Sequence, residues 1–311
     1  MKASAKALAF CVASGLLLFT LFGVLALYGD PQWSAAMSAG VVGACIGSFA
    51  NVVVYRLPRM MEQAWARDRQ EHDGAMATPC TGGEASADPA LPDQGISLTR
   101  PASACPQCGA TIRCWHNVPV LGFLLLQGRC ADCDAPISRR YLWVEATFAG
   151  AFALMGWTFG PGFDLVGYAF LFSMLLILVL IDWDTHLLPD CLTQPLLWAG
   201  LLFNVSGLGI DLEDAVSGAA LGYCTFWLIS RLFWIIARRE GLGEGDGKLV
   251  AALCAWLGWQ ALPWIMCGAV LSTLICTACL VCSGRTQWSA PQPFGPHLAL
   301  AGGVVAWMLN R

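Results

Sequence analysis

Long apolar stretches follow one another along most of this chain, and they constrain its fold more than any other feature. A bilayer core of about 30 Å needs roughly 20 apolar residues per helix. Nine stretches are candidates for such helices: residues 8–28, 35–55, 142–159, 165–181, 191–208, 215–236, 249–260, 263–282 and 294–309. The chain is 57% hydrophobic and 12% charged, with a mean hydropathy of +0.61, which excludes an ordinary soluble globular protein. We therefore predict an all-α polytopic membrane protein of eight to nine transmembrane helices, the short seventh stretch being half-buried or re-entrant.

The basic residues predict how the chain is oriented, because cytoplasmic loops collect Lys and Arg. With Lys2 and Lys6 inside and nine crossings, all 17 Lys and Arg residues except Arg311 fall on or near the cytoplasmic side. The first apolar stretch resembles a secretory signal, but it is long, and "ALYGD" is an indifferent cleavage site. We expect residues 1–34 to form an uncleaved extra anchor, with a removed signal peptide as the alternative.

One polar segment, residues 58–140, interrupts the apolar stretches, and the orientation places it in the cytoplasm. Its first half contains "QEHDGAMATPCTGGEASADPALPDQG", which has no helical or strand period and is predicted to be a flexible insertion. The expected order is therefore an extra anchor at 1–34, a membrane helix at 35–57, this cytosolic loop at 58–140 and a membrane helix bundle at 141–311.

Two C-x-x-C pairs lie in the second half of the polar segment, Cys105 with Cys108 and Cys130 with Cys133. Such pairs suit a closed, four-thiolate zinc site, which stabilises a fold and leaves no open position for catalysis. A glycine follows the first pair and allows a tight turn. Disulfides are the alternative, but they seldom persist in a reducing cytoplasm. We predict a small cytosolic zinc-knuckle lobe, in which Cys114 and His116 are weaker candidate ligands because neither has a partner at this spacing.

Carboxylates stand at the ends of two apolar stretches. "LLILVLIDWDTHLLPD" places Asp182 directly after an apolar run, and "EGLGEGDGKLV" places Asp246 just before the stretch at 249–260. The orientation puts both acids at the cytoplasmic boundary, where they can meet. Two adjacent carboxylates do not both ionise readily, so one keeps its proton while the other acts as a base on water. Spacing alone leaves equally open that each acid caps a helix or sits among headgroups, as Asp190 after Pro189 illustrates.

Five motifs together resemble those of the type IV prepilin leader peptidase and N-methyltransferase family. They extend from about residue 40 to the C-terminus, and their order makes chance agreement very small. The motifs are "GSFANVVVYRLPRMM" at 47–61, the cysteine pairs followed by "PISRRYLWVE" at 136–145, "IDWDTHLLPD" at 181–190, "GEGDGK" at 243–248 and "PFGPHLALAGG" at 293–303.

The resemblance implies a GxGD-type membrane aspartic peptidase with Asp182 and Asp246 as its catalytic pair. Asp184, Asp190 and Lys248 match other recurrent positions of the family. The implied activity removes the basic leader from type IV prepilins or type II secretion pseudopilins at the cytoplasmic face of the bacterial inner membrane. It then methylates the new N-terminal residue from S-adenosylmethionine. No nucleic-acid partner is expected.

The residues that bind the methyl donor are not indicated by any glycine-rich fingerprint, so the methyltransferase expectation rests on the resemblance alone. We place the donor in the cytosolic lobe and the nearby "NVVVYRLPRMM" segment, because S-adenosylmethionine is available on that side and the peptidase motifs lie elsewhere.

Two other classes of protein remain as alternatives. A metal-dependent membrane enzyme would use Asp182, Asp184, His186 and Asp190 as ligands, although it would leave Asp246 unused and the sequence holds no HExxH motif. A transporter or assembly scaffold would use boundary acids to relay protons or to pair with Arg56 or Arg239.

Overall fold

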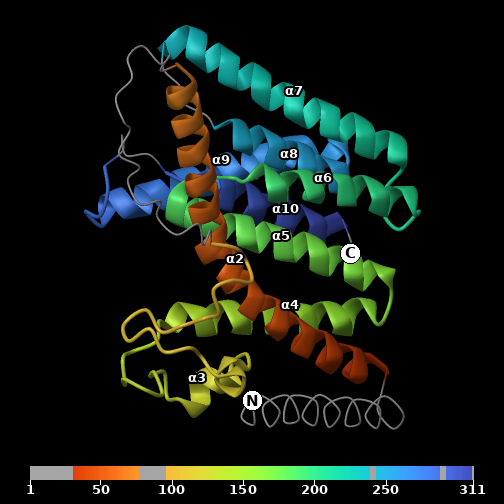
Figure 1. Ribbon diagram of the computed structural model, residues 1–311. Helices are drawn as coiled ribbons and strands as arrows, with labels where there is room; N and C mark the ends of the chain where they lie inside the picture. Colours follow the sequence, from red (N-terminus) through yellow and green to blue (C-terminus); the bar gives the residue numbers. More distant parts are fainter. Residues whose placement is uncertain (1–30, 77–95, 239–242, 288–291, 310–311) are drawn as a thin grey trace. The chain divides into compact units, whose positions relative to one another are not determined.

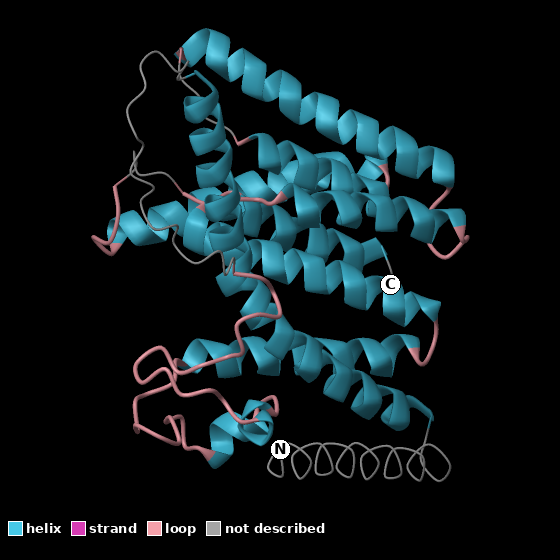
Figure 2. Cartoon of the chain, viewed as in Figure 1, coloured by secondary structure: helices cyan, strands magenta, loops and turns pink. Residues whose placement is uncertain are grey.

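The computed structural model describes residues 31–76, 96–238, 243–287 and 292–309, and within these ranges it is built from helices (Figures 1 and 2). No strand occurs among the described residues, which contain only two isolated β-bridges, Ala104 with Thr111 and Arg129 with Pro136. The all-α prediction is confirmed for this part of the chain. Residues 1–30 of the expected N-terminal anchor, most of the insertion and Arg239 lie outside the described residues, and residues 31–34 are the start of α2.

The helices follow the apolar stretches that the sequence marks from residue 35 onward. Their bounds are α2 Pro31–Met76, α3 Leu121–Leu125, α4 Arg139–Phe159, α5 Phe163–Thr185, α6 Asp190–Val205, α7 Leu212–Ala237, α8 Glu244–Leu257, α9 Leu262–Cys282 and α10 Gly295–Leu309, with short 3₁₀ turns η1 at Cys114–Asn117 and η2 at Trp259–Ala261.

Five of the described helical segments are long and apolar enough to cross a membrane, and α10 is a shorter apolar helix. The five are Pro31–Glu71, Arg139–Phe159, Phe163–Thr185, Leu212–Ile236 and Trp259–Cys282. This number of apolar helices is typical of a membrane protein.

The described residues form two compact units, 43–149 and a second unit of 31–42 with 150–309. In the second unit α8 is the central helix and contacts α6, α7 and α10 (Figure 1). Every residue of α8 from 249 to 257 is buried. A helix that is apolar all round belongs inside a protein, which explains why this short stretch carries no polar face.

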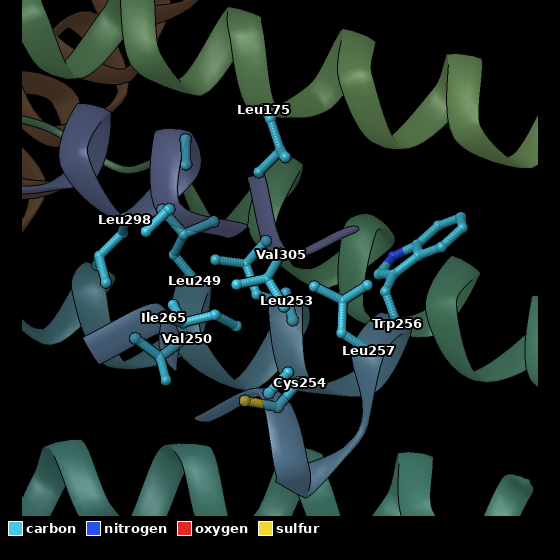
Figure 3. Packing of buried hydrophobic residues seen from close by; sticks show 14 of the residues in the cluster. Leu175, Leu249, Val250, Leu253, Cys254, Trp256, Leu257, Ile265, Leu298 and Val305 are labelled. Carbon is cyan, nitrogen blue, oxygen red and sulfur yellow. The ribbon is translucent and has the colours of Figure 1, made fainter. Parts of the chain in front are cut away.

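The core around α8 is a continuous cluster of aliphatic side chains (Figure 3). Leu249 and Leu253 meet Leu298 and Val305 of α10, and Ile265 of α9 closes one side. On the opposite side α7 approaches closely at Gly218, where an added Cβ would lie 2.8 Å from the Cys254 carbonyl oxygen. The bundle thus holds α8, and the residues at its N-terminus, in a fixed position.

In the first unit the part of α2 around Gly47 packs against the middle of α4. An added Cβ at Gly47 would lie 2.9 Å from Phe148 Cβ, so the two helices are in close contact there. Helix α2 does not end near Pro58 but continues to Met76. The start of the expected flexible insertion, residues 70–76, is therefore helical, because good helix formers in "RMMEQAWARDRQE" carry the helix past the proline.

Candidate functional site

Asp182 lies in the last turn of α5, directly after the apolar run that forms most of that helix. The helix ends where His186 adopts a left-handed conformation with a φ of 54°, and its N–H donates to the Asp182 carbonyl at 2.9 Å. The Asp182 side chain is only 5% exposed. A carboxylate buried to this extent requires partners, because desolvation disfavours its charge.

The backbone of Gly295, the first residue of α10, provides one such partner. Its N–H donates to Asp182 Oδ2 at 3.0 Å across 113 positions of sequence. The N-terminus of a helix carries a partial positive charge, so this contact favours a negative charge on Asp182. A Cβ at Gly295 would lie 2.7 Å from the same oxygen, so only glycine permits this approach.

Asp246 lies in the first turn of α8 and is 9% exposed. Burial, with a further contribution from the nearby Asp182 carboxylate, raises the pKa of Asp246 to about 7. The backbone of Gly243, the N-cap of α8, acts in the opposite direction and is the weaker influence. Asp246 is thus a carboxyl group that holds a proton near neutral pH.

Leu188, in the loop between α5 and α6, contacts the starts of both α8 and α10. Its side chain lies against Gly245 of α8, where an added Cβ would be 2.7 Å from Leu188 Cβ. It also lies against Gly295 of α10, at 3.3 Å from an added Cβ. The end of α5 and the starts of α8 and α10 therefore meet at one end of the bundle (Figure 1). Two buried carboxyl groups at one end of the bundle, one of which accepts a backbone hydrogen bond and the other of which has a raised pKa, are suited to general acid–base chemistry.

The other acids of the "IDWDTHLLPD" motif are exposed. Asp184 and His186 are both at the surface, and Asp190 forms an ion pair with Lys248, whose Nζ lies 2.6 Å and 2.7 Å from the two carboxylate oxygens. This pair joins the start of α6 to α8, two residues after Asp246. Within the described part of the chain Asp182, Asp184, His186 and Asp190 do not gather into a metal-binding group, so nothing in the geometry favours the metal-enzyme alternative.

The four cysteines of the polar segment do come together. The sulfur atoms of Cys105, Cys108, Cys130 and Cys133 all lie within 4.8 Å of one another. The Sγ atoms of Cys105 and Cys133 are 3.8 Å apart, too far for a disulfide. In a tetrahedral site with Zn–S bonds near 2.3 Å the sulfurs are about 3.8 Å apart. The donor set and the spacing both fit a structural zinc ion.

Two similar turns build this cluster. Cys105 N–H donates to the Ala110 carbonyl, and Cys130 N–H donates to the Ala135 carbonyl, so each pair closes a tight knuckle. Gly109 has a φ of 71° in the first, as expected, and Asp134 adopts 55° in the second. His116 does not belong to the cluster among the described residues, and the Cys114 side chain lies outside them.

The first unit contains further polar contacts between residues that the sequence does not indicate as partners. The guanidinium of Arg56 donates to the carbonyls of Ser97, Leu98 and Pro101 at 2.8–3.3 Å, so it anchors the segment that leads into the lobe. The buried Glu145 of α4 accepts a hydrogen bond from the Val120 N–H at 2.7 Å. The guanidinium of Arg56 thus binds backbone carbonyls, whereas the transporter alternative would pair it with an acid.

Family models match most of the chain. Residues 41–159 match the bacterial peptidase A24 N-terminal domain, and residues 169–281 match the type IV leader peptidase family. The two matches contain the cysteine cluster and the two buried acids, respectively.

Proteins named prepilin leader peptidase/N-methyltransferase are similar along most of their length. The one from Burkholderia pseudomallei (strain 1026b) is 45% identical over 84% of this chain and 82% of its own. The one from Pseudomonas putida is 40% identical over 93% of this chain and 95% of its own, and the one from Neisseria gonorrhoeae is 38% identical over 86% and 88%. No solved structure matches this chain.

Proposed function

Since the chain belongs to the type IV leader peptidase family, we propose that it is a membrane aspartic endopeptidase that also N-methylates its product. Its substrates are type IV prepilins or type II secretion pseudopilins, from which it removes the basic leader. The observation that carries this proposal is the meeting of two buried carboxyl groups, Asp182 and Asp246, at one end of the helix bundle.

The two acids take different roles in the proposed mechanism. Asp182, which accepts a hydrogen bond from Gly295, is the anion that removes a proton from the attacking water. Asp246 is the acid that donates its proton to the oxygen of the scissile carbonyl. Water adds to the carbonyl carbon, and the tetrahedral intermediate then collapses as its C–N bond breaks. The leaving amine takes the proton that Asp182 removed from the water, and one hydroxyl of the intermediate returns its proton to Asp246. No covalent bond forms between enzyme and peptide.

The membrane topology of the proposal places this centre at the cytoplasmic face of the bacterial inner membrane. Eight to nine crossings, with basic loops inside, bring the end of α5 and the starts of α8 and α10 to that face. A prepilin has a short basic leader followed by an apolar helix, so its scissile bond lies at the same depth. The substrate is therefore presented in the membrane beside the two acids.

We assign the cysteine cluster to a structural zinc ion held by Cys105, Cys108, Cys130 and Cys133. Four thiolates complete the coordination of zinc, so the ion stabilises the lobe and supplies no reacting group. The methyl donor, S-adenosylmethionine, is assigned to this lobe and to residues 51–61.

The proposed function is tested by co-expressing the protein with candidate prepilins and measuring the N-terminal masses of the products. We expect loss of the leader and a gain of one methyl group. Cleavage by the purified protein should persist in the presence of a chelator, because no metal takes part in hydrolysis. A prepilin that keeps its leader in every pairing, or cleavage that stops on removal of a divalent metal from a folded protein, would contradict the proposal.

A further inference from the structure

Helix α3 carries an apolar stripe that the described residues of the first unit leave uncovered. Leu121, Leu124 and Leu125 are spaced i, i+3 and i+4, so they share one face of the helix. Their side chains are 57%, 57% and 77% exposed. The other face is packed at Gly122, where an added Cβ would collide with the His116 carbonyl. Three neighbouring exposed leucines in a polar, cysteine-rich lobe indicate contact with an apolar medium.

Glu145 fixes the level of α3 along α4. Its Oε2 atom accepts the N–H of Val120, the N-cap residue of α3, at 2.7 Å, and its side chain is buried. Val120 has a φ of 60°, an unfavourable conformation for a β-branched residue, so the contact stabilises a strained backbone. Glu145 lies six residues beyond Arg139, the first residue of α4 and of the segment that is long and apolar enough to cross a membrane. At 1.5 Å per residue, α3 starts about 9 Å along that segment.

The side chains at the start of α4 are those of a membrane–water interface. Tyr141 and Trp143 precede Glu145 and are 44% and 70% exposed. Exposed Tyr and Trp collect where headgroups meet acyl chains. Figure 1 draws α3 beside the N-terminal half of α4, in agreement with the Val120–Glu145 hydrogen bond. The start of α3 therefore lies beside the part of α4 that carries this pair of aromatic residues.

Basic residues lie on either side of α3 in the sequence of the lobe. Arg113 and Arg129 are both exposed, and the guanidinium of Arg113 lies 5.9 Å from the ring centre of Trp115. Leucines bordered by Trp and Arg are the composition of segments that lie in the headgroup region of anionic membranes.

We propose that α3 is an interfacial anchor whose Leu121, Leu124 and Leu125 insert into the cytoplasmic leaflet of an anionic bilayer. Arg113 and Arg129 then contact lipid phosphates, and the zinc-knuckle lobe lies on the membrane surface. This inference is independent of the peptidase activity, because it concerns only the first unit and its lipid contacts.

The test places a small fluorescent amino acid at Leu125 in the full-length protein, reconstituted in nanodiscs that contain phosphatidylglycerol. A matched variant carries the same label at Asp132, an exposed polar position of the lobe. A third variant, labelled at Leu124, shows whether a result at Leu125 reflects the stripe or a local distortion caused by the label at that one position. Two quenchers are compared, bromine atoms on the upper acyl chain and iodide in the water.

We expect the labels at 125 and 124 to be quenched by brominated lipid, with loss of iodide quenching relative to the label at 132. If iodide quenches all three labels equally, the stripe lies in water and the proposal is wrong. If both leucine positions are shielded from bromine and from iodide, protein covers the stripe and the proposal is also wrong. Because neither readout uses cleavage, failure here leaves the proposed peptidase function unaffected.

Discussion

At the scale of single residues, the contact between Gly295 and Asp182 distinguishes the two acids. Both acids are buried, but a backbone N–H at a helix start holds Asp182 in one position, and the pKa of Asp246 is raised to about 7. The motif at 293–303 therefore helps to position Asp182. The sequence does not indicate this contact, because the glycine and the aspartate are 113 positions apart and form no local pattern. The burial of both acids, in contrast, follows from apolar stretches that sequence analysis recognised.

Gly295→Ala should therefore inactivate cleavage. The new Cβ would lie 2.7 Å from Asp182 Oδ2 and would displace the carboxylate. Misplacement by about 1 Å costs roughly 100-fold in rate, so kcat should fall by that order while KM changes little. Gly303→Ala is the matched control in the same helix, because nothing lies within 4 Å of its added Cβ. Equal activity in the two variants would show that the Gly295 contact does not position the acid.

The pH dependence of cleavage should report the protonation of Asp246. Burial and Asp182 raise its pKa to about 7. Because the protonated form is the proton donor, activity should be retained below this pKa and lost as the pH rises through about 7. The measurement is kcat/KM for a prepilin between pH 5 and pH 9 (an assay range of roughly two units on each side of the transition). Asp184→Asn should show the same alkaline limb. A flat profile above pH 7 would exclude Asp246 as the donor.

At the scale of elements, the order of helices was predictable and their ends were less so. Apolar stretches from residue 35 onward all became helices, since a run of apolar residues between polar loops has one stable form in a membrane. Helix α2 exceeded its expected length, because a proline removes one hydrogen bond without ending a helix rich in Ala, Arg and Gln. At 46 residues α2 is about 69 Å long, so it extends well beyond a bilayer.

The cysteine knuckles could be predicted because their four cysteines occur as two pairs in the sequence. The hydrogen bond between Val120 and Glu145, which positions α3 beside α4, could not be predicted, because the two residues share no such pattern. We expect one zinc ion per chain and its loss on Cys105→Ser or Cys130→Ser. Structural zinc binds isolated finger peptides with roughly 10–16 kcal/mol, so these variants should also unfold the lobe at lower temperature.

Elemental analysis of the purified protein measures the metal, and proteolysis of the lobe measures its stability. Cys224→Ser serves as the control, since that cysteine is exposed on α7 and lies outside the cluster. Intact protein without zinc would rule out the structural metal.

At the scale of the whole molecule, the two proposed activities use different parts of the chain. Hydrolysis needs the paired acids of the second unit, whereas methyl transfer needs a donor pocket and alignment of the reacting atoms. Asp182→Asn should therefore abolish cleavage yet still transfer labelled methyl groups from S-adenosylmethionine to a pilin supplied already cleaved. Cys108→Ser should abolish methyl transfer, because it disrupts the lobe to which the methyl donor is assigned. If folded Asp182→Asn enzyme transfers no label while the wild type does, the two centres are not separable.

In the proposed mechanism Asp182 and Asp246 form one hydrolytic pair. The most direct measurement is the N-terminal mass of a prepilin co-expressed with Asp182→Asn, Asp246→Asn or Asp184→Asn, each at confirmed membrane levels. The account predicts that the first two variants leave the leader in place, with activity reduced by at least about 10⁴-fold, whereas the exposed Asp184 variant still yields cleaved pilin. Wild-type cleavage by either Asp182→Asn or Asp246→Asn would contradict it.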